Sequence, residues 1–416
     1  MPSVDGGIRC VPDLPADPPL TERKTMLVQG SIAADIRITN EHWDVVFATH
    51  LLERSFPAPI RLTIDLDNIA RNWRTARELQ SFLETATRDH RARICSLVVN
   101  CPGVKLDFRS ILLRAQFPEL RHLVIGKNLR KCALLTADGL SEAIPAATTL
   151  QVPSTIKLAN DEDVDGPIFT NVVKLELIGA HATTNRSVDW DFMAVVGRLP
   201  SLKFLSLENY FPDSSPPHSV SPVILPSCMR EISYQSCKSA SSIMDIDALF
   251  QHSSARRYVR LRRVDARTLV QTVAGALSNA GLRLKNGELR ADRTSGHLTT
   301  ATIVVNSPND YVELRIGAVL SSTIPAVYHI QAEGVDDSLA HMLACVPKDG
   351  MRDMLVVCDV PARCLWRYLG LSETLTKLHI VGSSAQEFAE VLEQDPEHSG
   401  EGTPKKCPDC TLSASP

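Results

Sequence analysis

The stretch PELRHLVIG at residues 118–126 contains one apolar residue, then two residues of another type, and then two apolar residues one position apart, Leu123 and Ile125. The same frame returns as LPSLKFLSLEN at residues 199–209. Because the side chains of a strand alternate between its two faces, the apolar pair faces one side and its neighbours face the other. Each stretch therefore predicts a short strand with one buried face.

The frame recurs at a nearly constant period. Seven apolar pairs follow it: Leu97/Val99, Leu123/Ile125, Leu150/Val152, Leu175/Leu177, Leu205/Leu207, Ile232/Tyr234 and Val259/Leu261. Their first members are 26, 27, 25, 30, 27 and 27 residues apart. A period of about 20 to 29 residues is typical of leucine-rich repeats, in which a strand and a return segment stack on neighbouring copies. We therefore predict an α/β, leucine-rich-repeat-like solenoid (horseshoe), with parallel strands on the concave face and a more irregular C-terminal part.

The regular repeats end near residue 265. Residues 264–282 have the apolar spacing of a helix, with Asp265 as a candidate N-cap. The alternating stretches 297–306 and 311–319 follow and are separated by SPND, which is typical of a hairpin. The predicted organisation is a disordered tail at 1–33, a lead-in helix and first strand region at 34–93, the regular array at 94–265, an irregular repeat continuation at 266–392, and a disordered tail at 393–416.

The composition disfavours several classes of protein. The 44 basic and 48 acidic residues give a net charge of −4, which is too balanced for binding to nucleic acid or an anionic membrane. No secretory signal is readable, and no stretch approaches the ~20 apolar residues of a membrane span. The 11 cysteines have no repeating spacing and indicate free thiols in a reducing compartment. We therefore expect a cytoplasmic or nuclear protein.

Two stretches match metal sites in part. Residues 161–166, DEDVDG, reproduce the first six positions of a calcium loop, but its twelfth position is Val172 instead of a bidentate glutamate. Cys407 and Cys410, with His398, supply three of the four ligands of a structural zinc site. We favour a solvated acidic turn and an unstructured thiol pair over metal sites, and predict no cofactor.

Motifs of known catalytic chemistry are absent from the sequence. It contains no nucleophile elbow, phosphate-binding loop, dinucleotide fingerprint or H-E-x-x-H helix. The 12 histidines are dispersed, and a packed or surface histidine is the default interpretation for each of them. We predict that the chain is not an enzyme, with an enzyme built on a repeat scaffold as the remote alternative.

An arginine cluster surrounds Tyr258 and consists of Arg256, Arg257, Arg260, Arg262, Arg263 and Arg267. In the repeat frame Tyr258, Arg260 and Arg262 face the concave side together, and arginine and tyrosine are favoured in protein interfaces. Acidic residues precede them on the same side, so the face is expected to be bipolar and to steer a partner of complementary polarity. The predicted partner-binding residues are Tyr258, Arg260, Arg262, Glu231, Glu208, Glu176 and Phe204. The alternatives are a solvated strand edge and a cross-strand pair between Glu231 and Arg260 that stabilises the fold.

Residues 34–68 contain a strand, a helix ending in L-x-R-S, prolines and a hydrophobic strand, in that order. They are Asp35-Ile36-Arg37-Ile38, then Leu51-Leu52-Glu53-Arg54-Ser55, then Pro57 and Pro59, then Ile60-Arg61-Leu62-Thr63-Ile64. With these motifs and its repeat strands, the chain resembles, over about residues 34–265, the F-box-like leucine-rich-repeat proteins of mushroom-forming (basidiomycete) fungi. The resemblance implies the substrate-recognition part of an F-box ubiquitin-ligase subunit, with an unidentified protein partner on the concave face.

The F-box itself is not evident. It would begin with Leu-Pro and an acidic amphipathic helix. Leu14-Pro15 is followed by Ala16-Asp17-Pro18-Pro19, which cannot continue as a helix. We therefore do not expect the ubiquitin-ligase adaptor to bind without an F-box. The alternative function is a stand-alone interaction protein without ubiquitin-ligase coupling.

Overall fold

A computed structural model of the chain divides into two units, residues 1–203 and 204–416. The structure describes residues 33–39, 44–66, 73–104, 106–114, 116–126, 135–153, 158–159, 167–179, 190–210, 222–236, 241–251, 255–279, 282–285, 288–291, 297–306, 311–319, 327–333, 353–357, 377–381 and 409–413. The predictions for the tail at 1–32, the acidic turn at 161–166, His398 and Cys407 lie outside these residues.

Unit 1 is built from parallel strands that follow the order of the chain. These are β1 (Ala34–Thr39), β2 (Ile60–Asp65), β3 (Ile94–Asn100), β4 (His122–Ile125), β6 (Thr149–Pro153) and β8 (Lys174–Ile178). Each strand pairs in parallel with the next one. A separate parallel pair consists of β5 (Leu135–Thr136) and β7 (Leu158–Ala159).

The register predicted for unit 1 is confirmed. Leu97 lies beside Leu123, and Leu123 lies beside Leu150, which in turn lies beside Leu175. Each of these four side chains is at most 1% exposed, so they form one apolar row across four strands. Full burial of a leucine side chain contributes about 1.5–3 kcal/mol, which makes the row a main source of stability.

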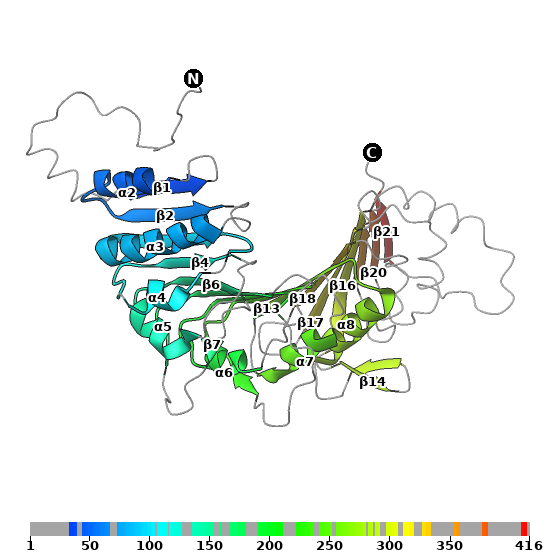
Figure 1. Cartoon of the computed structure of the whole chain (residues 1–416). Coiled ribbons are helices and arrows are strands. Elements are labelled where there is room, and N and C mark those ends of the chain that lie inside the picture. The colour runs from blue at the N-terminus through cyan, green and yellow to red at the C-terminus, as the bar shows by residue number, and fades with distance from the viewer. Residues whose placement is uncertain are drawn as a thin grey trace, which may run out of the picture. The chain divides into compact units, whose positions relative to one another are not determined.

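Helices in the return segments cover the buried side of the unit 1 strands (Figure 1). They are α2 (Val45–Arg54), α3 (Trp73–His90), α4 (Phe108–Leu112), α5 (Ala137–Ala143) and α6 (Phe192–Gly197). The strand, helix and strand predicted at residues 35–64 are β1, α2 and β2. The Ser55 hydroxyl donates to the Leu52 carbonyl at 2.7 Å and accepts from Nη2 of Arg93 at 2.8 Å. The L-x-R-S motif is therefore the end of α2, fixed by an arginine of the next repeat.

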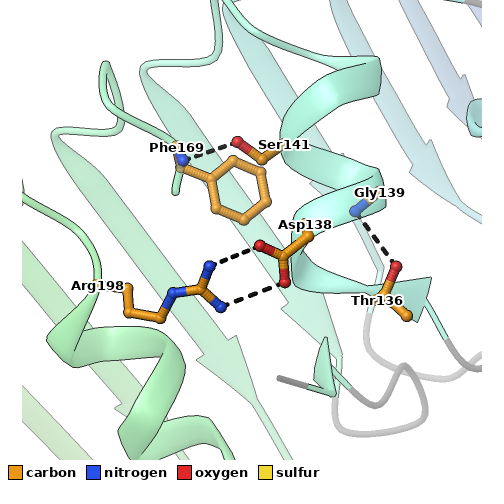
Figure 2. Close-up of polar contacts among 6 residues, drawn as sticks. All are labelled: Thr136, Asp138, Gly139, Ser141, Phe169 and Arg198. Carbon is orange, nitrogen blue, oxygen red and sulfur yellow. Dashed lines mark hydrogen bonds and ion pairs between the residues drawn. The ribbon is translucent and has the colours of Figure 1, made fainter. Parts of the chain in front are cut away.

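A polar connection joins α5, the segment before β8, and α6 on the helical side of unit 1 (Figure 2). Arg198, at the C-terminal end of α6, donates to both carboxylate oxygens of Asp138 in α5, at 2.6 and 3.2 Å. The backbone amide of Phe169 donates to the Ser141 hydroxyl at 2.8 Å. We call the Arg198–Asp138 ion pair the Asp138 link. It connects return segments that are two repeats apart.

Unit 2 begins with four parallel strands, β9 (Phe204–Glu208), β11 (Glu231–Ser236), β13 (Arg256–Arg262) and β18 (Val327–Glu333). Beyond β18 the order continues with β17 (Tyr311–Val319), β16 (His297–Asn306), β19 (Asp353–Val357), β20 (Lys377–Val381) and β21 (Asp409–Ser413). Strand β17 is antiparallel to both of its neighbours, which confirms the predicted hairpin. The remaining elements are α7 (Ser241–Leu249), α8 (Ala266–Asn279), the parallel pair β10 (Val223–Ile224) and β12 (Phe250–Gln251), and the antiparallel pair β14 (Leu282–Lys285) and β15 (Glu288–Ala291).

The predicted cap of α8 is confirmed. Oδ1 of Asp265 accepts from the backbone amide of Thr268 at 2.6 Å. Hydrogen bonds from the Thr268 side chain and from this amide lower the pKa of the Asp265 carboxyl. The tail predicted at 393–416 is wrong for five residues, because β21 pairs with β20. An unpaired edge strand offers backbone donors and acceptors to any neighbouring segment, and the composition of a tail does not reveal such pairing.

The register predicted for the seventh repeat is wrong. Val259 was expected in line with Ile232, but Arg257 lies beside Ile232, and Val259 lies beside Tyr234. Arg257 thus occupies a core position and is 6% exposed. Its Nε donates to Oδ1 of Asp247 in α7 at 2.8 Å, and the Tyr234 hydroxyl donates to the same oxygen at 2.8 Å. A frame that aligns only apolar pairs cannot place an arginine in the core, where charged residues are rare unless paired.

The chain is therefore an α/β protein with mostly parallel strands. Among the described helices, none is both long and apolar enough to cross a membrane.

Candidate partner-binding face

The side chains of β9, β11, β13 and β18 alternate between buried and half-buried or exposed. Leu205, Tyr234 and Leu261 are buried, and the Tyr234 hydroxyl donates to Asp247, so the buried side of these strands is the side of α7. The alternate residues form the other side, which we call the open face. Its described members are Phe204, Ser206, Glu208, Glu231, Ser233, Gln235, Arg256, Tyr258, Arg260, Arg262, His329 and Gln331.

The parallel register arranges the open face in rows that cross the strands. The rows are Phe204, Glu231, Arg256; then Ser206, Ser233, Tyr258, His329; then Glu208, Gln235, Arg260, Gln331. Neighbouring strands lie about 4.7–4.9 Å apart, so successive members of a row are direct neighbours.

Six of the seven predicted partner-binding residues lie on the open face: Phe204, Glu208, Glu231, Tyr258, Arg260 and Arg262. The seventh, Glu176, belongs to β8 of unit 1. Oε1 of Glu176 lies 2.5 Å from Nζ of Lys174 in the same strand. The negative charge of Glu176 is therefore offset within its own strand, and the candidate site is confined to unit 2.

An aromatic pair lies in the central row. The ring centroids of Tyr258 and His329 are 5.1 Å apart, with 54° between the ring planes. Nε2 of Gln331 lies 3.4 Å from Nε2 of His329. His329 is not among the residues predicted from the sequence to bind the partner. The alternation at residues 326–332, AVYHIQA, indicates a strand, but only the structure shows that this strand lies beside β13.

Charge changes sign between β11 and β13. Glu208 and Glu231 are on β9 and β11, whereas the arginines of the open face are all on β13. The alternative pairing of Glu231 with Arg260 does not fit the register, which places Arg256 beside Glu231 and Gln235 beside Arg260. Among the described residues, no ion pair involves Glu231. The acidic and basic groups are thus arranged side by side across the strands.

Metal ligands do not gather in the part of the chain that the structure describes, where no three His, Cys, Asp or Glu side chains form a cluster suited to an ion. No known family model matches the chain, and a search of curated proteins found no match. A functional assignment therefore depends on the fold and on the open face.

Proposed function

We propose that this chain is a protein–protein interaction module whose open face binds the partner. The observation that carries the proposal is the combination, on one sheet face, of a Tyr258–His329 aromatic pair with arginines on β13 and carboxylates on β9 and β11. Aromatic residues and arginine are enriched in protein interfaces and among their strongest contacts. A strand edge that was merely solvated would not require the aromatic pair.

The repeat architecture supports this class of protein. Parallel strands whose apolar positions lie in register, each followed by a return segment, fit a leucine-rich-repeat-like solenoid of horseshoe form. Such arrays expose an extended sheet face to partners. We place the protein in the cytoplasm or nucleus, and we propose a binding role and no catalysis.

The resemblance to F-box-like proteins supports a more specific role, in which the open face holds a substrate protein for ubiquitination. The alternative is binding without ubiquitin-ligase coupling. Mixing the purified chain with the ligase adaptor separates these roles, and we expect no complex from this chain alone. A stoichiometric complex that is lost on deleting residues 1–40 would contradict that expectation.

A peptide-display library selected against the purified chain tests the binding role. Peptides that bind the open face should lose at least about tenfold in affinity for the Tyr258→Ala/Arg260→Ala variant, since aromatic and arginine anchors dominate interface energies. The matched control is Thr149→Ala/Gln151→Ala on β6 of unit 1, which should bind the same peptides unchanged. If the first variant melts at a lower temperature and keeps its affinity, the arginine cluster is structural and the proposal fails.

A further inference from the structure

We infer, on the basis of the proposed function, that the partner presents an extended segment in which a basic and an acidic side chain lie two or three residues apart. The basic side chain would lie over β9 and β11, and the acidic one over β13. The inference rests on the order of charges and side-chain sizes across the strands of the open face.

The central row begins with the two shortest side chains of the open face. Ser206 and Ser233 lie side by side, and the Tyr258 ring is next in the same row. Along their own strands they are flanked by longer side chains, among them the two carboxylates. A partner side chain can therefore approach the backbone of β9 and β11 more closely at the serines than at either flanking row.

Carboxylates flank this position on both sides. Glu208 follows Ser206 by two residues, and Glu231 precedes Ser233 by two, which places each about 6.6 Å along the strand from its serine. That distance is within reach of a glutamate side chain. A cation held above the serines would interact with both carboxylates and with the neighbouring Tyr258 ring, since aromatic rings attract cations within about 6 Å.

Strand β13 carries positively charged side chains on the open face, in contrast to the carboxylates of β9 and β11. Arg256 and Arg260 lie two residues on either side of Tyr258 on the open face. Guanidinium groups bind carboxylates through two parallel hydrogen bonds, which gives both energy and geometric specificity. A carboxylate of the partner is therefore the side chain that β13 fits best.

The strand spacing fixes the distance between the two partner charges. One to two strand spacings separate the acidic strands from β13, which is about 5–10 Å. An extended chain advances about 3.3 Å per residue, so a segment that crosses the strands covers this distance in two or three residues. Either chain direction satisfies the pattern, so both basic-x-x-acidic and acidic-x-x-basic segments fit.

Four labelled synthetic peptides of otherwise identical Gly/Ser/Thr sequence test the inference by fluorescence anisotropy. They carry Arg-x-x-Glu, Glu-x-x-Arg, Arg-x-x-Arg or Glu-x-x-Glu. The full chain should bind at least one mixed-charge peptide about tenfold more tightly than either like-charge peptide, and added salt should weaken that preference. Equal binding of all four peptides, or no measurable binding of any, would overturn the inference.

Two charge variants make the test directional. Arg256→Glu/Arg260→Glu makes the face acidic and should switch the preference to Arg-x-x-Arg, whereas Glu208→Arg/Glu231→Arg should switch it to Glu-x-x-Glu. An unchanged preference in folded variants would overturn the inference. If a reversal variant does not fold, Glu208→Gln/Glu231→Gln removes both charges at nearly constant shape and should abolish the mixed-charge preference.

The outcome is distinguishable from failure of the proposed function. Display-selected peptides that depend on Tyr258 and Arg260 but lack the charge spacing would leave the open face as the binding site and refute only the charge pattern. Selected peptides that are insensitive to both residues, together with no binding of the synthetic peptides, would refute both proposals.

Discussion

Each unit contains an arginine–aspartate ion pair on the helical side of its strands, but the two pairs have different surroundings. In unit 1 the Asp138 link joins return segments around an apolar core, and its arginine and aspartate side chains are 13% and 16% exposed. In unit 2 the Arg257–Asp247 pair lies inside the core, with side chains 8% and 0% exposed. A repeat can therefore accept arginine at a core position where the return helix supplies a carboxylate.

Removal of the buried carboxylate should have the largest effect. Asp247→Ala leaves the Arg257 guanidinium buried without its ionic partner and should cost about 3–5 kcal/mol in the free energy of unfolding, measured with urea. The control is Asp245→Ala on the exposed side of the same helix, which should change stability by less than about 0.5 kcal/mol.

A double replacement sharpens the same comparison. Arg257→Met/Asp247→Leu removes both charges and keeps an apolar core, so it should recover most of the stability lost in Asp247→Ala. If Asp247→Ala costs less than about 1 kcal/mol in the free energy of unfolding, the core of unit 2 does not depend on the Arg257–Asp247 pair.

Breaking the Asp138 link should have a smaller effect. Asp138→Ala frees an Arg198 side chain that can turn toward water, so we expect a loss of about 1–2 kcal/mol, by the same urea measurement. Glu142→Ala, at an exposed position of the same helix, is the control. If Asp138→Ala and Asp247→Ala cost the same, the distinction between the two pairs is wrong.

The smallest effect concerns pH and a carboxyl in unit 1. Glu84 of α3 accepts from the Ser110 hydroxyl of α4 at 2.6 Å and from the Gln80 amide at 2.7 Å, and these contacts lower the pKa of Glu84. A carboxyl whose pKa is lower in the folded state stabilises the fold above its unfolded pKa of about 4.3 and loses that contribution as pH falls through the folded pKa.

We therefore expect Glu84→Gln to reduce stability at neutral pH, with a difference from the parent chain that shrinks as pH falls below about 4. Urea midpoints measured across this range check the result. Glu119→Gln, at an exposed position, is the control variant. If the difference in stability between Glu84→Gln and the parent chain stays constant with pH, the effect comes from the changed shape of the side chain and not from its charge.

The sequence predicts those parts of the fold that depend on local periodicity. Leu97, Leu123, Leu150 and Leu175 align as expected because each lies at the same place in its own repeat. The cap at Asp265 and the exposed side of Tyr258 follow from spacing within one element for the same reason.

Features that depend on distant partners could not be predicted. Arg257 is a core residue only because Asp247 and Tyr234 meet its charge, and no periodicity encodes that contact. Strands β16 and β17 follow β13 in the chain and pair with each other, but β13 itself pairs with the later strand β18. This pairing brings His329 beside Tyr258. Of the candidate site, the residues of β9, β11 and β13 could be anticipated, but the partner strand β18 could not.

The pairing of β13 with β18 also affects the order of assembly during synthesis. From β3 to β8 of unit 1, neighbouring strands pair residues 25–27 apart, so each strand can pair soon after it leaves the ribosome. Tyr258 and His329 are 71 residues apart, and closing so long a loop carries a larger entropic cost and slows folding. Until β18 emerges, β13 presents an unpaired strand edge, and such an edge can pair with another chain.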